Sequence, residues 1–300
     1  MTYGTMLVVS ILVCFLYDLL RVKRAALPVK TCLISLPLIL LCALVLSRLT
    51  YVLCFLDLEM FDEYWVEDVL LSKKITEFSV FGGAVGACLG VYLAARLTHA
   101  RSLPYLDAFA PAGALLLCGI RIAEVHQGRL GAGMYLPEGS PLARFPLAIT
   151  NDWGEAFLSV FLLEAAVALI VAILFSVLPA LKAGRCFTYT VLYLALPQIF
   201  FESLRAISMR WGFVHIEQLF CGLLVLLMVF LGCRKVHMAF TPRFLPVLGV
   251  IGCIGIIVFV EFALDKFAIP DLLCYGIMIL ALSGMAVLEH YTLHRLDRAE

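Results

Sequence analysis

Long apolar runs, separated by shorter polar connections, fill most of the chain. A helix needs roughly 20 apolar residues to cross the hydrocarbon core of a bilayer. Runs of this kind predict membrane-spanning helices at residues 4–20, 31–55, 79–95, 104–122, 157–178, 188–204, 214–233, 244–264 and 272–289. The pattern therefore predicts an all-α fold, a polytopic transmembrane helix bundle with about nine spans.

The composition agrees with a bilayer as the solvent. Of the 300 residues, 63% are hydrophobic and 15% are charged, and the mean hydropathy is +1.04. A soluble domain of this size needs more polar residues to cover its surface. The formal net charge is zero and there is no basic tract, so we expect membrane lipid as a partner and no nucleic acid. No cofactor and no metal site is predicted.

The basic residues between the spans indicate the orientation of the chain. Alternate connections and the C-terminal tail carry 13 of the 22 lysines and arginines, whereas the other connections carry seven and most of the acids. Because cytoplasmic connections are rich in Lys and Arg, the N-terminus is predicted outside and the C-terminus in the cytoplasm. Two outward-facing segments are long, 56–78 and 123–156. A loop of that length has a function or is disordered.

Several ionisable or polar side chains fall inside the predicted spans or at their ends. Placing a charge at the centre of a span costs about 2.5–3.5 kcal/mol, so each needs a partner, a cavity or a substrate. One explanation is a set of salt bridges between helices. The other is an outward-opening cavity lined with guanidinium groups, which suit a lipid phosphate because they bind two oxygens at once. The residues are Arg48, Arg121, Glu164, Gln198, Glu202, Arg205, Glu217 and Gln218.

The third predicted span carries glycines at intervals of four, Gly82, Gly86 and Gly90. One face of that helix is therefore bare backbone. Close packing against another helix is the usual reason for such a face. Approach of a substrate to the backbone is the alternative.

Short segments of the chain match, in order and spacing, the motifs of one enzyme family. They are Arg48–Leu53, Phe81–Gly86, Leu103–Ala112, Arg121–Arg129, Glu202–Arg205 and Glu217–Gln218. Over about residues 5–235 the chain resembles prolipoprotein diacylglyceryl transferase. The resemblance implies a transferase-like transmembrane domain at 1–235, with 236–300 as an additional C-terminal helix pair.

The resemblance implies a multi-pass enzyme of the bacterial inner membrane. It would move a diacylglyceryl group from phosphatidylglycerol to the lipobox cysteine of preprolipoprotein signal peptides. Arg121 would bind the phosphate, and Glu124 and His126 are the candidate bases nearest to it in the sequence. His215 is expected at the membrane interface and not as a base. The implied substrate-binding residues are Arg48, Tyr51, Gly82, Gly83, Gly86, Arg121, Gln198, Glu202, Arg205 and Gln218.

The chain also departs from the family pattern. Phe81 stands where the family has a histidine, and Ala123–Glu124 stands where its signature has Gly-Asn. Gln198 stands where the family has a second arginine. These changes leave open a non-catalytic relative that binds lipid or lipoprotein precursors. A small-molecule transporter is a third possibility, but the two halves of the chain show no internal repeat.

Overall fold

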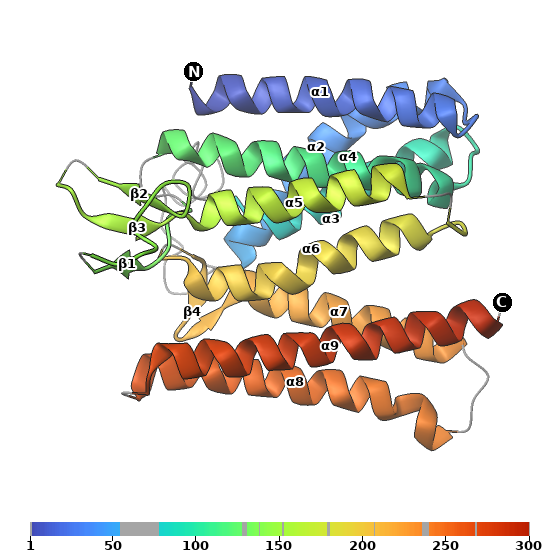
Figure 1. Cartoon of the computed structure of the whole chain (residues 1–300). Coiled ribbons are helices and arrows are strands. Elements are labelled where there is room, and N and C mark those ends of the chain that lie inside the picture. Colours follow the sequence, from blue (N-terminus) through green and yellow to red (C-terminus); the bar gives the residue numbers. More distant parts are fainter. Residues whose placement is uncertain are drawn as a thin grey trace, which may run out of the picture. The chain divides into compact units, whose positions relative to one another are not determined.

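The computed structural model describes residues 2–54, 78–127, 131–137, 139–151, 153–178, 181–206, 208–235, 240–267 and 269–299. The chain divides into two compact units, Met1–Val191 and Leu192–Glu300, and the division falls within α6. Most of the predicted outward segment 56–78 lies outside the described residues. The long helices are α1 (Tyr3–Arg24), α2 (Val29–Cys54), α3 (Val80–Leu97), α4 (Ser102–Ala123), α5 (Val160–Val177), α6 (Arg185–Leu204), α7 (Ile216–Lys235), α8 (Phe240–Lys266) and α9 (Asp271–Ala299) (Figure 1).

Each predicted span coincides with one of these helices, so the all-α, polytopic fold is confirmed. Within the described residues, eight helices are long and apolar enough to cross a bilayer. The exception is α6, in which Pro197, Gln198 and Glu202 interrupt the apolar run. The orientation of the termini and the domain boundary between 235 and 236 stay predictions.

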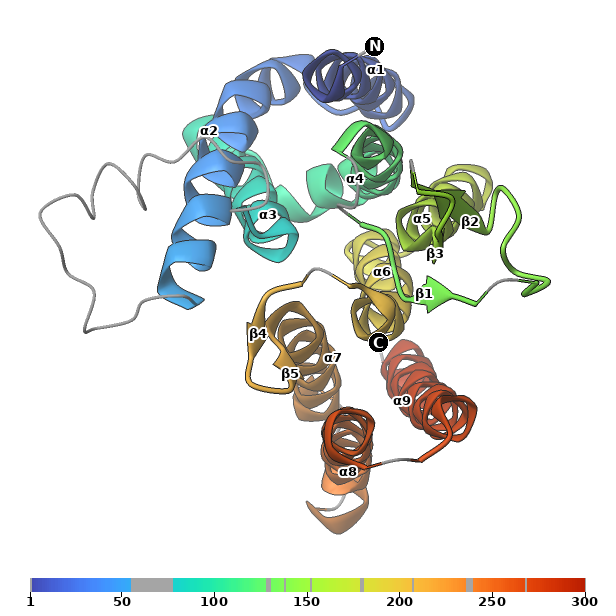
Figure 2. The ribbon, with the colours of Figure 1, turned by 90° about the vertical axis from the view of Figure 1, so that its left-hand side faces the viewer.

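In the first unit, α2 packs most extensively against α3, and the reason is the row of glycines. A Cβ atom at Gly86 would lie 2.6 Å from the Cα of Ala43, and one at Gly90 would lie 2.6 Å from the Cα of Ile39. A side chain at either position would overlap the backbone of α2. This face of α3 is therefore filled by α2, in agreement with the packing explanation for the glycine spacing. Figure 2, which looks along the helices, shows α3 against α2 and α4 beside both α1 and α5.

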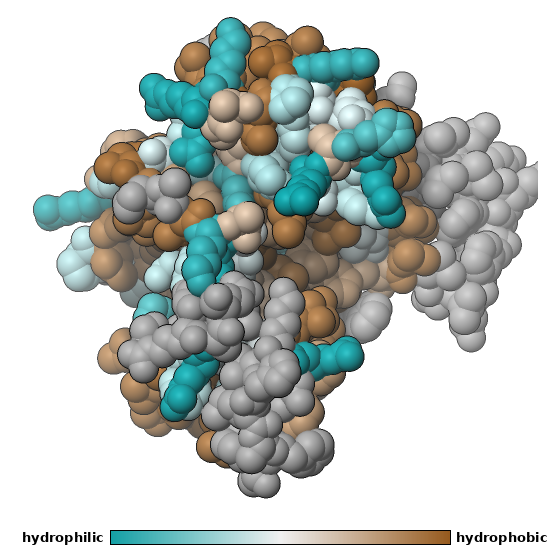
Figure 3. Space-filling view, turned by 90° about the vertical axis from the view of Figure 1, so that its right-hand side faces the viewer, coloured by the Kyte–Doolittle hydropathy of each residue, from teal (hydrophilic) through white to brown (hydrophobic). Residues whose placement is uncertain are grey.

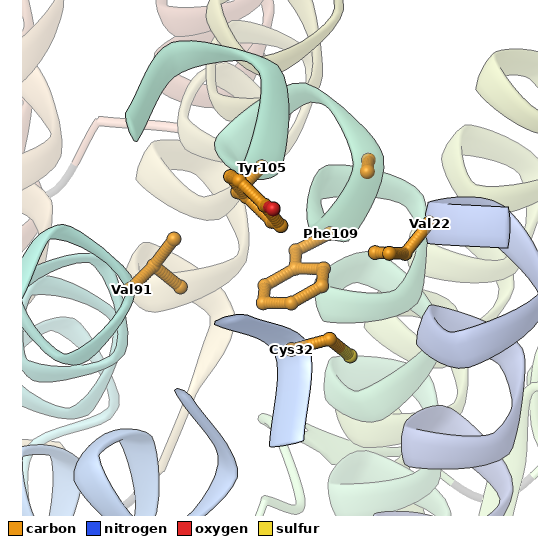
Figure 4. Close-up of a cluster of buried hydrophobic side chains, with 6 residues drawn as sticks. Val22, Cys32, Val91, Tyr105 and Phe109 are labelled. Carbon is orange, nitrogen blue, oxygen red and sulfur yellow. The ribbon is translucent and has the colours of Figure 1, made fainter. Parts of the chain in front are cut away.

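A hydrophobic cluster joins α1 to α4 near one end of this unit (Figure 4). Val22 of α1, Cys32 of α2 and Val91 of α3 surround Tyr105 and Phe109 of α4. The two rings of α4 meet edge to face with their centroids 6.4 Å apart. The buried hydroxyl of Tyr105 donates a hydrogen bond to the Pro28 carbonyl at 3.0 Å, so the ring spans the cluster without leaving a polar group unsatisfied.

The same end of the first unit carries basic residues that the sequence analysis assigns to the cytoplasm. Arg21 donates to the carbonyl of Phe175 at 3.4 Å, which joins the end of α1 to the end of α5. The carboxylate of Asp107 accepts from the backbone amides of Gly184 and Phe187 and so holds the start of α6 to α4. Figure 3 shows hydrophilic side chains on this end and apolar ones on the flanks. Which side of the membrane it faces stays a prediction.

The described residues of the segment 123–156, with those just after it, are folded. They form η3 (Glu124–Gln127) and a small antiparallel sheet of β1 (Tyr135–Leu136), β2 (Ala148–Thr150) and β3 (Ala156–Leu158), in the order β1-β3-β2. Tyr135 pairs with Phe157, and Ala148 pairs with Leu158. Of the two interpretations left open for this segment, disorder does not apply to its described part.

The second unit contains the end of α6, the hairpin of β4 (Arg210–Trp211) and β5 (Val214–His215), and α7, α8 and α9. Each of α7, α8 and α9 packs against the other two. The hairpin turns at Gly212, whose φ of +60° suits glycine. Phe213 at the turn meets Phe262 of α8 edge to face at 5.2 Å, so the hairpin is seated on α8.

The glycine row allows a matched test of the α2–α3 packing. Gly86→Ala is expected to lower the free energy of unfolding by about 1–3 kcal/mol, because the added methyl group overpacks the contact with Cys42 and Ala43. At Gly83 a Cβ atom would lie 3.7 Å from the nearest heavy atom, which is ordinary contact. Gly83→Ala is therefore the control and should melt at the wild-type temperature in detergent. Equal melting temperatures for the two variants would contradict the packing described.

Candidate functional site

Among the described residues of the first unit, Arg121, in the last turn of α4, is one of the most deeply buried charges, with a side chain that is 2% exposed. Its Nη1 lies 2.5 Å from Oε1 of Glu124, the first residue of η3. Its Nε lies 2.5 Å from Oε2 of Glu164, on α5. One guanidinium thus faces two carboxylates that are themselves almost fully buried. The cluster joins three elements, and among the described residues it brings one guanidinium together with two carboxylates.

A glycine makes room for the carboxylate of Glu124. A Cβ atom at Gly131 would collide with Glu124 Oε2 and lie 2.9 Å from the Cβ of Phe161. The φ of Gly131 is +75°, which L residues with a side chain rarely adopt. Both the space and the backbone conformation therefore require glycine there.

The two candidate bases have different surroundings. Glu124 is 5% exposed and lies in the ion pair with Arg121. His126, two residues on, is exposed, and its Nε2 contacts the Sδ of Met6 at 3.1 Å. The structure therefore places Glu124 at Arg121 and His126 at the surface beside α1. A catalytic role for either residue stays a prediction.

Arg48 lies on α2, is 7% exposed and stacks on aromatic rings. The guanidinium carbon is 5.3 Å from the ring centre of Tyr51 and 5.5 Å from that of Phe78. Such contacts stabilise a cation that has little access to water. Arg48 therefore lies beside Tyr51, and the predicted role of both residues in substrate binding stays a prediction. Gly82, Gly83 and Gly86 lie on the face of α3 that meets α2, and their predicted role in substrate binding is untested.

In the second unit the predicted residues at the end of α6 and just after it form one chain of contacts. Gln198 Nε2 donates to Oε1 of Glu202 at 2.8 Å. The Nε of Arg205 lies 3.5 Å from the same oxygen. Gln198 and Glu202 share one face of α6, as their spacing of four predicts, and Arg205 follows directly after Leu204, the last residue of the helix.

Gln218 of α7 has two buried partners. Its Nε2 donates to the carbonyl of Ile199 at 3.0 Å and to Oε1 of Glu261 at 2.9 Å. Glu261 lies on α8 and is 5% exposed. The sequence analysis missed Glu261, although an acid within an apolar run is the same signal that selected Glu164.

His215, expected at the interface, is buried at 3% exposure on β5, just before α7. Its Nδ1 lies 3.0 Å from Ser208 Oγ, to which the Nε of Arg210 also donates at 3.0 Å. Its Nε2 lies 3.7 Å from Oε2 of Glu261. Burial and the positive charge of Arg210 lower the pKa of His215 to about 4. The imidazole is therefore neutral at pH 7.

A model of the prolipoprotein diacylglyceryl transferase family matches residues 1–234, well over half of the chain. The chain belongs to this family. Neither the curated proteins nor the solved structures searched contain a match. Family membership makes the protein a transferase of lipoprotein biosynthesis, and its apolar helices make it a multi-pass membrane protein. The matched region ends within α7, so α8 and α9 lie beyond it.

The neutral His215 predicts a pH-dependent stability. Its pKa is lower in the folded protein than the usual 6.5, so the unfolded chain binds the proton more readily. The contribution of the neutral His215 to the free energy of unfolding is therefore fully present above pH 6.5. It falls by about 3 kcal/mol as the pH drops toward 4. Melting temperatures in detergent should fall over this range more steeply for the wild type than for His215→Gln. Melting temperatures that fall equally with pH in the two proteins would contradict the lowered pKa of His215.

Proposed function

We propose that the protein transfers a diacylglyceryl group from phosphatidylglycerol to the lipobox cysteine thiol of preprolipoprotein signal peptides, in the bacterial inner membrane. The observation that carries the proposal is the burial of Arg121, which lies within the family-matched residues and which the resemblance assigns to the signature arginine. A guanidinium in a water-poor site binds phosphate oxygens strongly. The same cation stabilises the negative charge that develops on a departing phosphate.

The transfer is a substitution at the glyceryl carbon that carries the phosphate ester. A bond forms between the cysteine sulfur and this carbon, and the carbon–oxygen bond breaks. Glycerol phosphate leaves with the electron pair of that bond, and a base takes the thiol proton. A base is needed because a free cysteine, with a pKa of about 8.5, is mostly protonated at neutral pH.

The ion pairs of Arg121 suggest how one site both binds the donor phosphate and takes up the thiol proton. The donor phosphate replaces Glu124 at Nη1, while Glu164 keeps its contact with Nε and holds the guanidinium in place. The displaced carboxylate of Glu124 then accepts the thiol proton. His126 lies two residues on, at the surface, where it can pass the proton to water. The exchange keeps one anion on Nη1 throughout, so the buried cation is never left uncompensated.

The other residues carried over from the family would bind the donor and the peptide. In the first unit, Arg48 would contribute further positive charge to the phosphate and Tyr51 a hydrogen-bonding group for the headgroup. In the second unit, the resemblance alone assigns substrate binding to Gln198, Glu202, Arg205 and Gln218.

A second function is favoured by two observations. Arg121 is already paired with two carboxylates, so its positive charge is compensated before any phosphate binds. Phe81, where the family has a histidine, removes the usual base. With these ion pairs kept closed, the protein would bind lipid or lipoprotein precursors without transferring the diacylglyceryl group.

A transfer assay separates the two functions. The purified protein is incubated with phosphatidylglycerol and a lipobox peptide that has one cysteine, and mass spectrometry detects the thioether. Wild type is expected to form it. Arg121→Lys keeps the charge but loses the planar fork, and we expect a loss of roughly 10²–10³ in kcat. Lysine is preferred to alanine because removing one partner of a buried ion pair destabilises a protein by about 3–5 kcal/mol.

The base is tested in the same assay. The double variant Glu124→Gln, His126→Ala should lose transfer while still binding phosphatidylglycerol, because the phosphate contact with Arg121 remains. Full activity of this variant would exclude both residues as bases. No thioether from the wild type, with phosphatidylglycerol still bound, would assign the non-catalytic function.

A further inference from the structure

Two glycines of α8 face open space. Among the described residues, a Cβ atom at Gly252 or Gly255 would have no heavy atom within 4 Å. By contrast, a Cβ atom at Gly249 on the same helix would lie 2.6 Å from Cδ1 of Leu288 on α9. Packing against α9 therefore explains Gly249 but neither Gly252 nor Gly255. Both lie beyond residue 234, where the family match ends.

The two glycines line a groove of about 460 Å³ between α8 and α9, which lie side by side in the second unit (Figure 1). Its lining is apolar throughout. Val260 and Ala263 of α8 and Cys274 of α9 are buried and form its floor, whereas Phe259 and Leu273 are more than half exposed and form its walls. A volume of about 300–1,000 Å³ is usual for a site that holds one small ligand.

The groove is about as long as one leaflet of a bilayer is deep. From Gly252 to Ala263 the axis of α8 rises by about 16 Å, and half of the hydrocarbon core is about 15 Å thick. The groove ends one turn before Lys266, the last residue of the span. An acyl chain reaches from the interface to the middle of the bilayer, whereas a second spanning helix would need contacts in both leaflets. The length therefore favours an acyl chain as the occupant.

Charged groups of both signs lie at the end of the groove next to the α8–α9 connection. Lys266 follows Ala263 by three residues and so continues the face of α8 that lines the groove. Its Nζ lies 3.0 Å from Oδ2 of Asp265, and both side chains are exposed. Asp271, the first residue of α9, adds a second carboxylate two residues before Leu273. A zwitterionic headgroup offers a phosphate to the lysine and an ammonium group to the carboxylates, whereas an anionic headgroup offers them no cation.

We propose that the α8–α9 groove binds one acyl chain of a zwitterionic phospholipid, whose headgroup lies at Asp265 and Lys266. The bound chain fills the space that Gly252 and Gly255 leave open. The site lies within the second unit and beyond the family match, so it does not rest on the proposed transfer. It gives the C-terminal helix pair a lipid of its own, which differs in charge from the phosphatidylglycerol donor.

The test uses two photoreactive lipids and four full-length proteins in vesicles. The lipids are phosphatidylethanolamine and phosphatidylglycerol, each with the same diazirine-bearing acyl chain, and mass spectrometry maps the labelled peptides after illumination. The proteins are the wild type, Gly255→Leu, Gly276→Leu and Asp265→Asn. Gly276 is the matched control, because it lies on α9, does not line the groove and would also accept a Cβ atom without a contact to the described residues.

We expect wild-type label on α8 and α9, with phosphatidylethanolamine preferred by about threefold, as exposed ion pairs provide. Gly255→Leu should lower this label by about tenfold, because the leucine takes the place of part of the chain and removes its packing contacts. Gly276→Leu should be labelled as the wild type is. Asp265→Asn should keep the label but lose the preference, since the ammonium group loses a partner and Lys266 is left to favour an anion.

Three results would overturn the proposal. Equal labelling of Gly255→Leu and Gly276→Leu would show that no lipid chain occupies the groove. Equal labelling of the wild type by the two lipids would exclude a zwitterionic headgroup. A wild-type dimer that takes no label on α8 and α9, and that Gly255→Leu dissociates, would assign the groove to a second copy of the chain. If Gly255→Leu does not fold, Gly252→Leu fills the same groove from the next open position and is judged by the same criteria.

Discussion

A buried guanidinium needs anionic partners, because desolvating its charge costs several kcal/mol. At Arg121 that requirement is met by Glu124, which opens η3, and Glu164, in the second turn of α5. The ion pairs join the end of α4 to the elements that follow it, and Gly131 gives the Glu124 carboxylate its space. The structure at this end of the first unit therefore depends on keeping one cation and two anions together.

This dependence explains why the same cluster suits a binding site. A cation already held by a carboxylate is oriented and needs no reorganisation when another anion takes the place of the first. The family pattern that the chain resembles has a neutral side chain where this chain has Glu124. In the proposed function, Glu124 therefore covers the guanidinium until a phosphate competes for it. This proposed exchange would give Glu124, a departure from the family pattern, a function in the site.

Much of the fold follows from the sequence, because runs of about 20 apolar residues have few alternatives to a span. The spacing of Gly82, Gly86 and Gly90 likewise indicated that α3 packs closely against another helix, although it did not say which one. The ion pair of Arg121 with Glu124 was not predicted, since it depends on the turn of η3. His215 was placed at the interface because no spacing rule shows that the hairpin brings it to Glu261. Glu261 lies beyond the residues that resemble the family, so no motif of the family points to it.

The central claim is that a lipid phosphate takes the place of Glu124 on Arg121. Solid-state NMR measures this contact through the dipolar coupling between phosphorus and nitrogen, with arginine labelled with nitrogen-15 and phosphatidylglycerol in the bilayer. The account predicts a coupling at hydrogen-bond range that is present in the wild type and absent in Arg121→Lys. Identical spectra for the two proteins would contradict it and leave Arg121 as a structural ion pair.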